Sequence, residues 1–141
     1  MAADIFRAIE GLRLGKHFPD DAVLSTMAYK PGPGELFLVS YPKSGSTWTS
    51  RIMYNILMDA VDSGDPLEPL VRFPCLEIQG TEAAIYAPRL AVFKTHPPFH
   101  KNPYPTEAKY MHIARNSYDT CVSFHYHTKH FLAYKFQNST F

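Results

Sequence analysis

A lysine, a glycine and three hydroxyl side chains lie together in the segment 42–47 (PKSGST). The segment separates an apolar run from an amphipathic stretch, so it would place unpaired backbone N–H groups of a helix N-terminus beside Lys43. That combination favours an anion, and Gly45 allows the backbone to approach it closely. Lys43 precedes the glycine, whereas the ATP- and GTP-binding loop GxxxxGK[ST] has its lysine after the second glycine. The segment therefore predicts an anion site unlike that of a generic ATPase or GTPase; an ordinary capped loop with a solvated lysine is the alternative.

Basic side chains also follow two other apolar runs. Lys94 and His96 come after the run 90–93 (LAVF), and Arg115 comes after the run 110–114 (YMHIA). In a parallel sheet the carboxyl ends of the strands lie along one edge, where ligands of open α/β folds bind. We therefore expect these side chains and the 42–47 loop to converge on one cleft.

The elements that position these groups alternate between strands and helices. The short apolar runs 36–41 and 90–93 are typical of buried strands, the run 110–114 predicts a third strand, and the segment 119–131 is predicted to be helical. The segment 63–74 is expected to be mostly loop, and a short helix is one interpretation of the segment 77–86. This order predicts an α/β protein with a parallel sheet flanked by helices.

Another helix is predicted to open near Thr47, with a cap supplied by Ser44, Ser46 or Thr47. Its apolar residues recur with the helical period and would form one face against the sheet. The predicted face consists of Trp48, Ile52, Met53, Ile56, Leu57 and Ala60.

Composition narrows the class of protein. The chain has 141 residues, 45% of them hydrophobic and 19% charged, which is typical of one folded domain. A formal net charge of +1 argues against general attraction to nucleic acid or to a membrane. No apolar run reaches the ~20 residues of a membrane helix, and the two cysteines form no disulfide or metal pattern. We expect a cytoplasmic protein that binds neither nucleic acid nor membrane.

Three motifs resemble those of one enzyme family. The segment 41–48 (YPKSGSTW) is similar to the YPKSGTTW signature of the cytosolic sulfotransferases. The segments 88–90 (PRL) and 94–96 (KTH) resemble the next family motif. The segment 114–116 (ARN), followed by Asp119, Val122 and Ser123, resembles a third. The motifs occur in the order of the family, so the resemblance implies a P-loop-like sulfotransferase fold.

The resemblance also implies a reaction and a set of site residues. The family transfers a sulfuryl group from 3′-phosphoadenosine-5′-phosphosulfate (PAPS) to a hydroxyl or amine of a small acceptor such as a phenol or an alcohol, without a metal. It implies that Lys43, Lys94 and His96 are catalytic, with His96 as the base. The resemblance also implies residues that bind the nucleotide. The phosphosulfate would be held by Lys43, Ser44, Gly45, Ser46 and Thr47. Trp48 would lie near the adenine, and Arg115 and Ser123 would bind the 3′-phosphate.

Simpler interpretations exist for several of these residues. Trp48 suits the core of an amphipathic helix, Arg115 would pair with Asp119 one turn on, and Ser123 suits an ordinary helix hydroxyl. The histidines at 125, 127 and 130 have poor spacing for a metal, so we expect a helix surface there. Phe73 and Phe99 are candidates for an apolar acceptor site.

The resemblance covers nearly all of this chain but only the N-terminal half of the family members. We therefore expect residues 1–141 to be a partial, truncated sulfotransferase domain with exposed apolar surface. A homodimer is expected only if the C-terminal half exists. The alternative function is that of a truncated, non-catalytic remnant that binds nucleotides or other anions.

Overall fold

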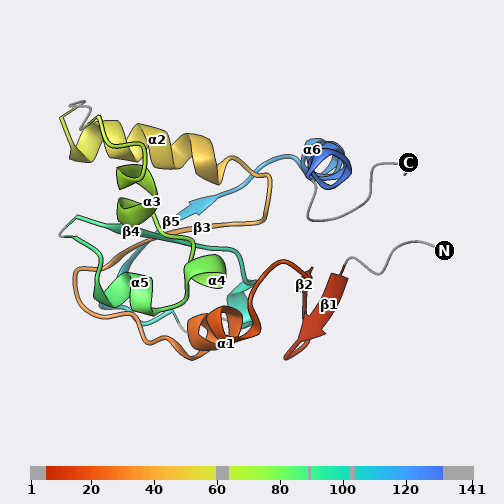
Figure 1. Cartoon of the computed structure of the whole chain (residues 1–141), viewed down its shortest axis with the longest axis horizontal. Coiled ribbons are helices and arrows are strands. Elements are labelled where there is room, and N and C mark those ends of the chain that lie inside the picture. The colour runs from red at the N-terminus through yellow and green to blue at the C-terminus, as the bar shows by residue number, and fades with distance from the viewer. Residues whose placement is uncertain (1–5, 60–63, 89, 102–103, 132–141) are drawn as a thin grey trace.

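A computed structural model describes residues 6–59, 64–88, 90–101 and 104–131 (Figure 1). Ala60 of the predicted helix face lies outside the described residues, as does Arg89 of the PRL motif.

A parallel sheet stands at the centre of the molecule. Strand β3 (Leu36–Ser40) lies between β4 (Val92–Thr95) and β5 (Lys109–Ile113), and both neighbours run parallel to it. Leu36 lies opposite Val92 on one side and Lys109 on the other, so the carboxyl ends of the strands lie side by side. The predicted α/β class with a parallel sheet is confirmed.

Strand β4 begins two residues later than predicted. Leu90 has a positive φ of 68°, and the N–H of Ala91 donates to the carbonyl of Pro88 at 3.1 Å. The chain therefore turns immediately before β4, and the strand continues to Thr95, two residues beyond its predicted end.

Helices cover both faces of the sheet (Figure 1). Phe37 and Val39 point to the face covered by α1 (Asp20–Ala28), α4 (Leu76–Gln79) and α5 (Glu82–Ile85), and Leu38 points to the opposite face. That opposite face is covered by α2 (Ser46–Leu57) and α3 (Glu68–Arg72). Alternation along β3 therefore divides the core into two clusters, one on each side. Helix α3 lies within the segment expected to be mostly loop.

The predicted apolar face of α2 is wrong in part. Met53 is buried as expected, but Trp48, Ile52 and Ile56 are exposed. Ser50 and Tyr54 are buried in their place because each polar group has a partner. The Ser50 hydroxyl donates to the carbonyl of Ser46 at 2.7 Å, and the Tyr54 hydroxyl donates to Glu68 on α3. Satisfied polar groups can be buried at little cost, which an apolar pattern does not reveal.

The predicted cap of α2 is also wrong. The N-cap residue is Gly45, and no side chain accepts a hydrogen bond there. Gly45 has a φ of 114°, a conformation that other residues rarely adopt. Backbone conformation, and not a hydroxyl side chain, therefore sets the start of the helix.

The N-terminal hairpin was not predicted. Strands β1 (Phe6–Ile9) and β2 (Leu12–Gly15) pair antiparallel across a two-residue turn formed by Glu10 and Gly11. Both turn residues have positive φ, at 47° and 76°, as a tight hairpin requires. The Glu-Gly pair between two apolar residues was the available signal.

A short 3₁₀ turn at Phe99–Lys101 lies between β4 and β5, and helix α6 (Ser117–His130) follows β5. Its N-cap is Asn116, whose side-chain oxygen accepts from the N–H groups of Tyr118 and Asp119 at 2.9 and 3.4 Å. The cap explains why the helix begins two residues before the predicted start. Within the described parts of the chain, no helix has the length and apolar character needed to cross a bilayer.

Candidate functional site

An open cleft lies at the carboxyl ends of the three parallel strands, bounded by the N-terminal hairpin and α6. The structure brings to this cleft all but one of the catalytic and nucleotide-binding residues expected from the sequence. Those that line it are Lys43, Gly45, Ser46, Thr47, Trp48, Lys94, His96, Arg115 and Ser123. Segments far apart in the sequence therefore meet at one place.

The loop between β3 and α2 has an unusual backbone. Lys43 and Gly45 both have positive φ, at 69° and 114°. The N–H of Ser44 donates to the carbonyl of Tyr41 at 3.2 Å, and the Ser44 side chain is buried away from the cleft lining. A left-handed lysine costs of order 1–3 kcal/mol, a strain that is typical of functional loops. The N-terminus of α2 follows immediately, so its positive dipole end opens on the cleft.

Arg115 connects two of the strand ends. Its Nη1 donates to the main-chain carbonyl of Lys43 at 3.1 Å, and it makes no ion pair with Asp119. Trp48 is 79% exposed at the edge of the same cleft, so its interpretation as a core residue is wrong.

The ring of His96 is held by the end of β3. Its Nδ1 lies 2.8 Å from the carbonyl oxygen of Ser40. A carbonyl only accepts hydrogen bonds, so Nδ1 must carry the proton. In the neutral imidazole, Nε2 is then the unprotonated nitrogen, which is the form that a general base requires.

Sequence reasoning missed two residues beside His96. Glu77 is fully buried on α4, and its carboxylate accepts from the backbone N–H of His96 at 3.1 Å. Cys75 lies next to it, and burial together with the charge of Glu77 raises the pKa of the Cys75 thiol. A charged residue in the short apolar segment 75–78 was the only signal.

Aromatic rings form the wall between the hairpin and α6. The centroids of Phe6 and Phe124 lie 6.4 Å apart, and Phe131 lies 5.5 Å from His17 and 5.2 Å from His127. Burial lowers the pKa of His17. Burial also lowers the pKa of His127, and the charges of Lys43 and His17 lower it further.

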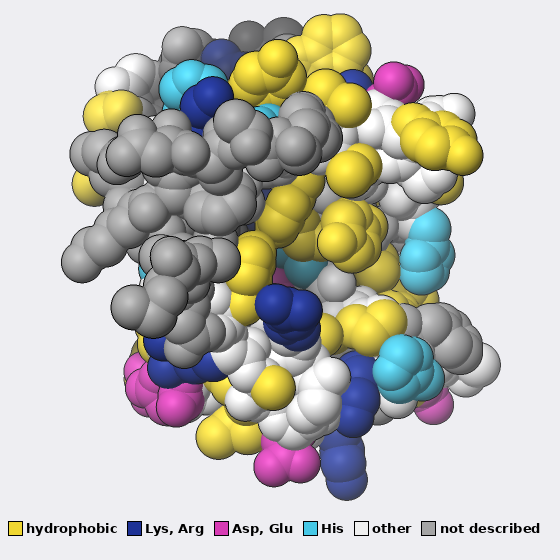
Figure 2. All heavy atoms as spheres, turned by 90° about the vertical axis from the view of Figure 1, so that its right-hand side faces the viewer, with side chains coloured by type: hydrophobic (Ala, Val, Ile, Leu, Met, Phe, Trp, Pro, Cys, Tyr) yellow, Lys and Arg dark blue, Asp and Glu magenta, His cyan; other side chains and the backbone are white. Residues whose placement is uncertain are grey.

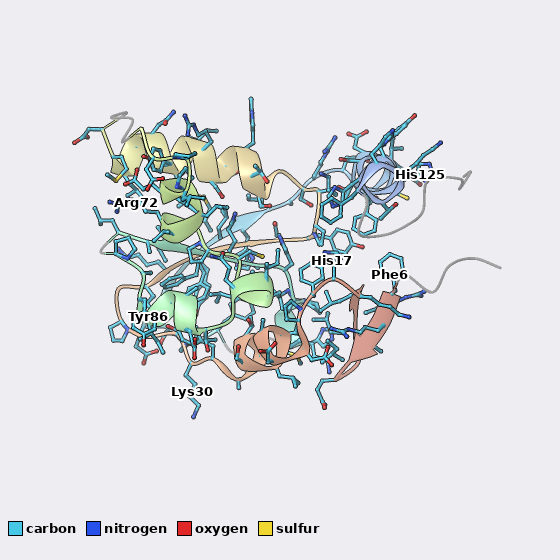
Figure 3. All side chains as sticks on the ribbon, viewed as in Figure 1. Phe6, His17, Lys30, Arg72, Tyr86 and His125 are labelled. Atoms are coloured by element: carbon cyan, nitrogen blue, oxygen red, sulfur yellow. The ribbon has the colours of Figure 1, made fainter. Side chains whose placement is uncertain are left out.

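Figure 3 shows Phe6 and His17 at this end of the molecule. Figure 2 shows hydrophobic side chains beside basic ones on the same face.

Phe73 does not belong to this wall. It is buried on the other side of the sheet, where its ring lies 6.3 Å from that of Tyr54. The side chain of Phe99 lies outside the described residues. In the described ranges, no group of three or more His, Cys, Asp or Glu side chains is arranged to hold a metal ion.

Comparison with known protein families gives a match to the sulfotransferase domain over residues 33–141. The chain belongs to the sulfotransferase family. The match includes the loop between β3 and α2, the ends of β4 and β5, and α6.

Two sulfotransferases illustrate how similar this chain is to its relatives. It is 30% identical over 128 residues to sulfotransferase 1A1 of Canis lupus familiaris, covering 84% of this chain and 43% of the relative. It is 28% identical over 127 residues to flavonol 3-sulfotransferase of Flaveria bidentis, covering 79% and 39%. The chain therefore spans less than half the length of these relatives.

Two solved structures resemble the fold of this chain. The mouse sulfotransferase SULT7A1, complexed with PAP, superposes with a TM-score of 0.67 at 22% identity, covering 89% of this chain and 44% of that one. Retinol dehydratase, in a complex with retinol and PAP, gives a TM-score of 0.57 at 19% identity, covering 84% and 46%. These similarities establish that the sheet and its helices follow the sulfotransferase fold.

Proposed function

We propose that this sulfotransferase-family protein transfers a sulfuryl group from PAPS to a hydroxyl or amine of a small acceptor. The observation that carries the proposal is the gathering of Lys43, His96 and Arg115 around one cleft. Two proteins with the same fold were solved with PAP, the nucleotide that remains after PAPS loses its sulfuryl group. The proposal makes residues 1–141 a partial sulfotransferase domain.

The donor would lie against the loop between β3 and α2. Backbone N–H groups at the start of α2, the hydroxyls of Ser46 and Thr47, and the charge of Lys43 suit a phosphosulfate. Ser44 would shape the loop through its turn with Tyr41. Trp48 offers an exposed ring at the cleft edge for the adenine.

The 3′-phosphate would lie between the ends of β5 and α6. Arg115 can give a phosphate two parallel N–H donors, and Ser123 adds a hydroxyl from α6. Because Arg115 also contacts the carbonyl of Lys43, the two ends of the nucleotide would be held by connected groups.

The transfer would begin when Nε2 of His96 accepts the proton of the acceptor hydroxyl. The acceptor oxygen attacks sulfur, and the bond between sulfur and the bridging phosphate oxygen breaks. Lys43 and Lys94 offset the negative charge on the departing phosphate and on the sulfuryl group. The products are a sulfate ester and 3′-phosphoadenosine 5′-phosphate.

The acceptor would lie against the aromatic wall. Phe6, Phe124 and Phe131 provide apolar surface beside the cleft, which suits a flat ring such as a phenol. The acceptor hydroxyl would then point toward His96 at the strand ends.

A transfer assay with radiolabelled PAPS and a panel of phenols, alcohols and amines tests the proposal on the full chain. Calorimetry with 3′-phosphoadenosine 5′-phosphate measures donor-site binding separately. Transfer to any acceptor supports the proposal. Nucleotide binding without transfer favours the second candidate, a non-catalytic nucleotide-binding remnant, which the coverage of less than half of each relative makes worth testing. The cytoplasmic location and a dimer of the longer protein stay predictions.

A further inference from the structure

Glu77 is a fully buried carboxylate whose hydrogen bonds all go to groups beside the cleft. Its Oε1 accepts from the hydroxyl of Thr95 at 2.5 Å and from the backbone N–H of His96 at 3.1 Å. Its Oε2 lies 3.3 Å from the thiol sulfur of Cys75. An ionised carboxylate accepts and cannot donate, so it suits a position faced by several donors.

No basic side chain in the described part of the chain forms an ion pair with this carboxylate. Burying a carboxyl group without an ion pair is costly, and hydrogen bonds with Thr95, His96 and Cys75 offset that cost. A purely structural position of this kind is more simply filled by an apolar residue, like its buried neighbour Leu76. The contacts of the carboxylate with the end of β4 therefore explain its presence better than fold stability does.

What it holds is the main chain at the end of β4. His96 is fixed at two points by two different elements: its backbone N–H by Glu77 of α4, and its ring Nδ1 by the carbonyl of Ser40 at the end of β3. The contact with Glu77 fixes the position of the His96 backbone, and the contact with the Ser40 carbonyl fixes the orientation of the ring. Loss of the hydrogen bond from Glu77 would let the end of β4 shift, and the ring of His96 would move with it.

We propose that Glu77 is a positioning residue for sulfuryl transfer, acting as a hydrogen-bond acceptor that keeps His96 aimed at the acceptor hydroxyl. The inference rests on the proposed function and adds to it a residue that lines the cleft beside His96 and would act through that histidine. Because the role belongs to an acceptor oxygen, an amide oxygen at the same place can perform it, whereas an apolar or shortened side chain cannot.

Three substitutions separate these cases. Glu77→Leu keeps the volume and removes the acceptor, and we expect kcat to fall about 10- to 100-fold, as small displacements of catalytic groups do. Glu77→Gln keeps an oxygen facing Thr95 and His96, and we expect kcat within about threefold of the original. Glu77→Asp keeps the charge but withdraws the acceptor by one methylene, and we expect about a tenfold loss. The acceptor KM and the dissociation constant of 3′-phosphoadenosine 5′-phosphate should stay unchanged in all three.

Glu82 on α5 supplies the matched control, because it is exposed and lies outside the cleft; Glu82→Leu and Glu82→Gln should leave kcat unaltered. Amide hydrogen exchange at His96 gives a readout independent of activity: protection should persist in Glu77→Gln and fall in Glu77→Asp and Glu77→Leu. If Glu77→Leu does not fold, Glu77→Asp and Glu77→Gln still give the comparison.

Several outcomes would overturn the proposal. These are unchanged kcat in Glu77→Asp and Glu77→Leu, an equal loss in Glu77→Gln and Glu77→Leu, or a loss confined to nucleotide affinity. If the unaltered protein shows no transfer, the proposed function fails, and exchange at His96 alone decides whether Glu77 holds that residue.

Discussion

At the scale of single residues, Lys43 combines a strained backbone with a charged side chain. Its positive φ and its carbonyl contact with Arg115 are main-chain features, so replacing the side chain leaves them in place. The residue therefore allows the contribution of the charge to be measured apart from the shape of the loop.

Lys43→Met is expected to weaken binding of 3′-phosphoadenosine 5′-phosphate about 10- to 100-fold, because a charge-assisted hydrogen bond to phosphate is lost. Calorimetry measures the change. Lys30→Met is the matched control, since Lys30 points away from the cleft (Figure 3). Equal affinity in the two variants would contradict the placement of the donor at this loop.

The two cysteines should differ in reactivity. Burial and the adjacent Glu77 raise the pKa of Cys75, whereas Cys121 is exposed on α6. Because the thiolate is the nucleophile, iodoacetamide at pH 8 should modify Cys121 first and Cys75 only after unfolding. Peptide mass spectrometry follows both sites, and early modification of Cys75 in the folded protein would show that the packing around α4 is wrong.

At the scale of elements, the start of α2 depends on one glycine. An added Cβ at Gly45 would meet no atom within 4 Å, so only its φ of 114° opposes a side chain. Gly45→Ala is expected to destabilise the protein by about 1–3 kcal/mol and to weaken nucleotide binding. Urea unfolding with calorimetry checks both effects. Gly34→Ala, at a φ of 81° and remote from the cleft, should show the first effect without the second.

Phe124 joins helix α6 to the hairpin and to the end of β3 through ring contacts. Phe124 lies 6.4 Å from Phe6 and 6.4 Å from Tyr41, measured between centroids. Phe124→Ala is therefore expected to lower stability by about 2 kcal/mol and to speed amide exchange in α6 and β1. Exchange in β3 should change less. Uniform acceleration throughout the chain would instead place Phe124 in the common core.

The sequence predicted the elements that carry chemistry better than those that frame them. β3 is a short apolar run and β5 is rich in apolar residues, and a basic residue follows each strand, so their places could be predicted from the pattern. The buried face of α2 could not be predicted from the pattern, because the hydroxyls of Ser50 and Tyr54 are buried only with hydrogen-bond partners that the pattern does not show. Glu77 could not be found for a similar reason: its partners come from β4, and local sequence does not show which carboxylate meets which strand end.

At the scale of the whole molecule, stability should decline in alkali. The hydroxyl of Tyr29 donates to Glu35 at 2.5 Å; burial, followed by this hydrogen bond and the carboxylate charge, raises the pKa of Tyr29. The folded state keeps that proton above pH 10, where the unfolded chain loses it. The stabilisation is therefore complete below pH 10 and is lost as the pH rises beyond it.

Tyr29→Phe should reduce the slope of this alkaline decline, measured as urea midpoints between pH 8 and 11. Tyr86→Phe, at a tyrosine that is 82% exposed, should keep the original slope. A Tyr29→Phe variant with the original slope would assign the decline to other buried groups, such as Cys75 and Tyr110, whose pKa values are also raised.

The central position of β3 links ligand binding to the order of assembly. Its neighbours, β4 and β5, both come from much later in the chain, so Lys43 meets Arg115 only after long segments have closed and paired. A nucleotide that contacts both residues would bind only the folded sheet, because the unfolded chain does not bring the two residues together. Such a ligand should stabilise the native state and lengthen its lifetime, whereas a chain that has not yet paired β3 with β5 should not bind it.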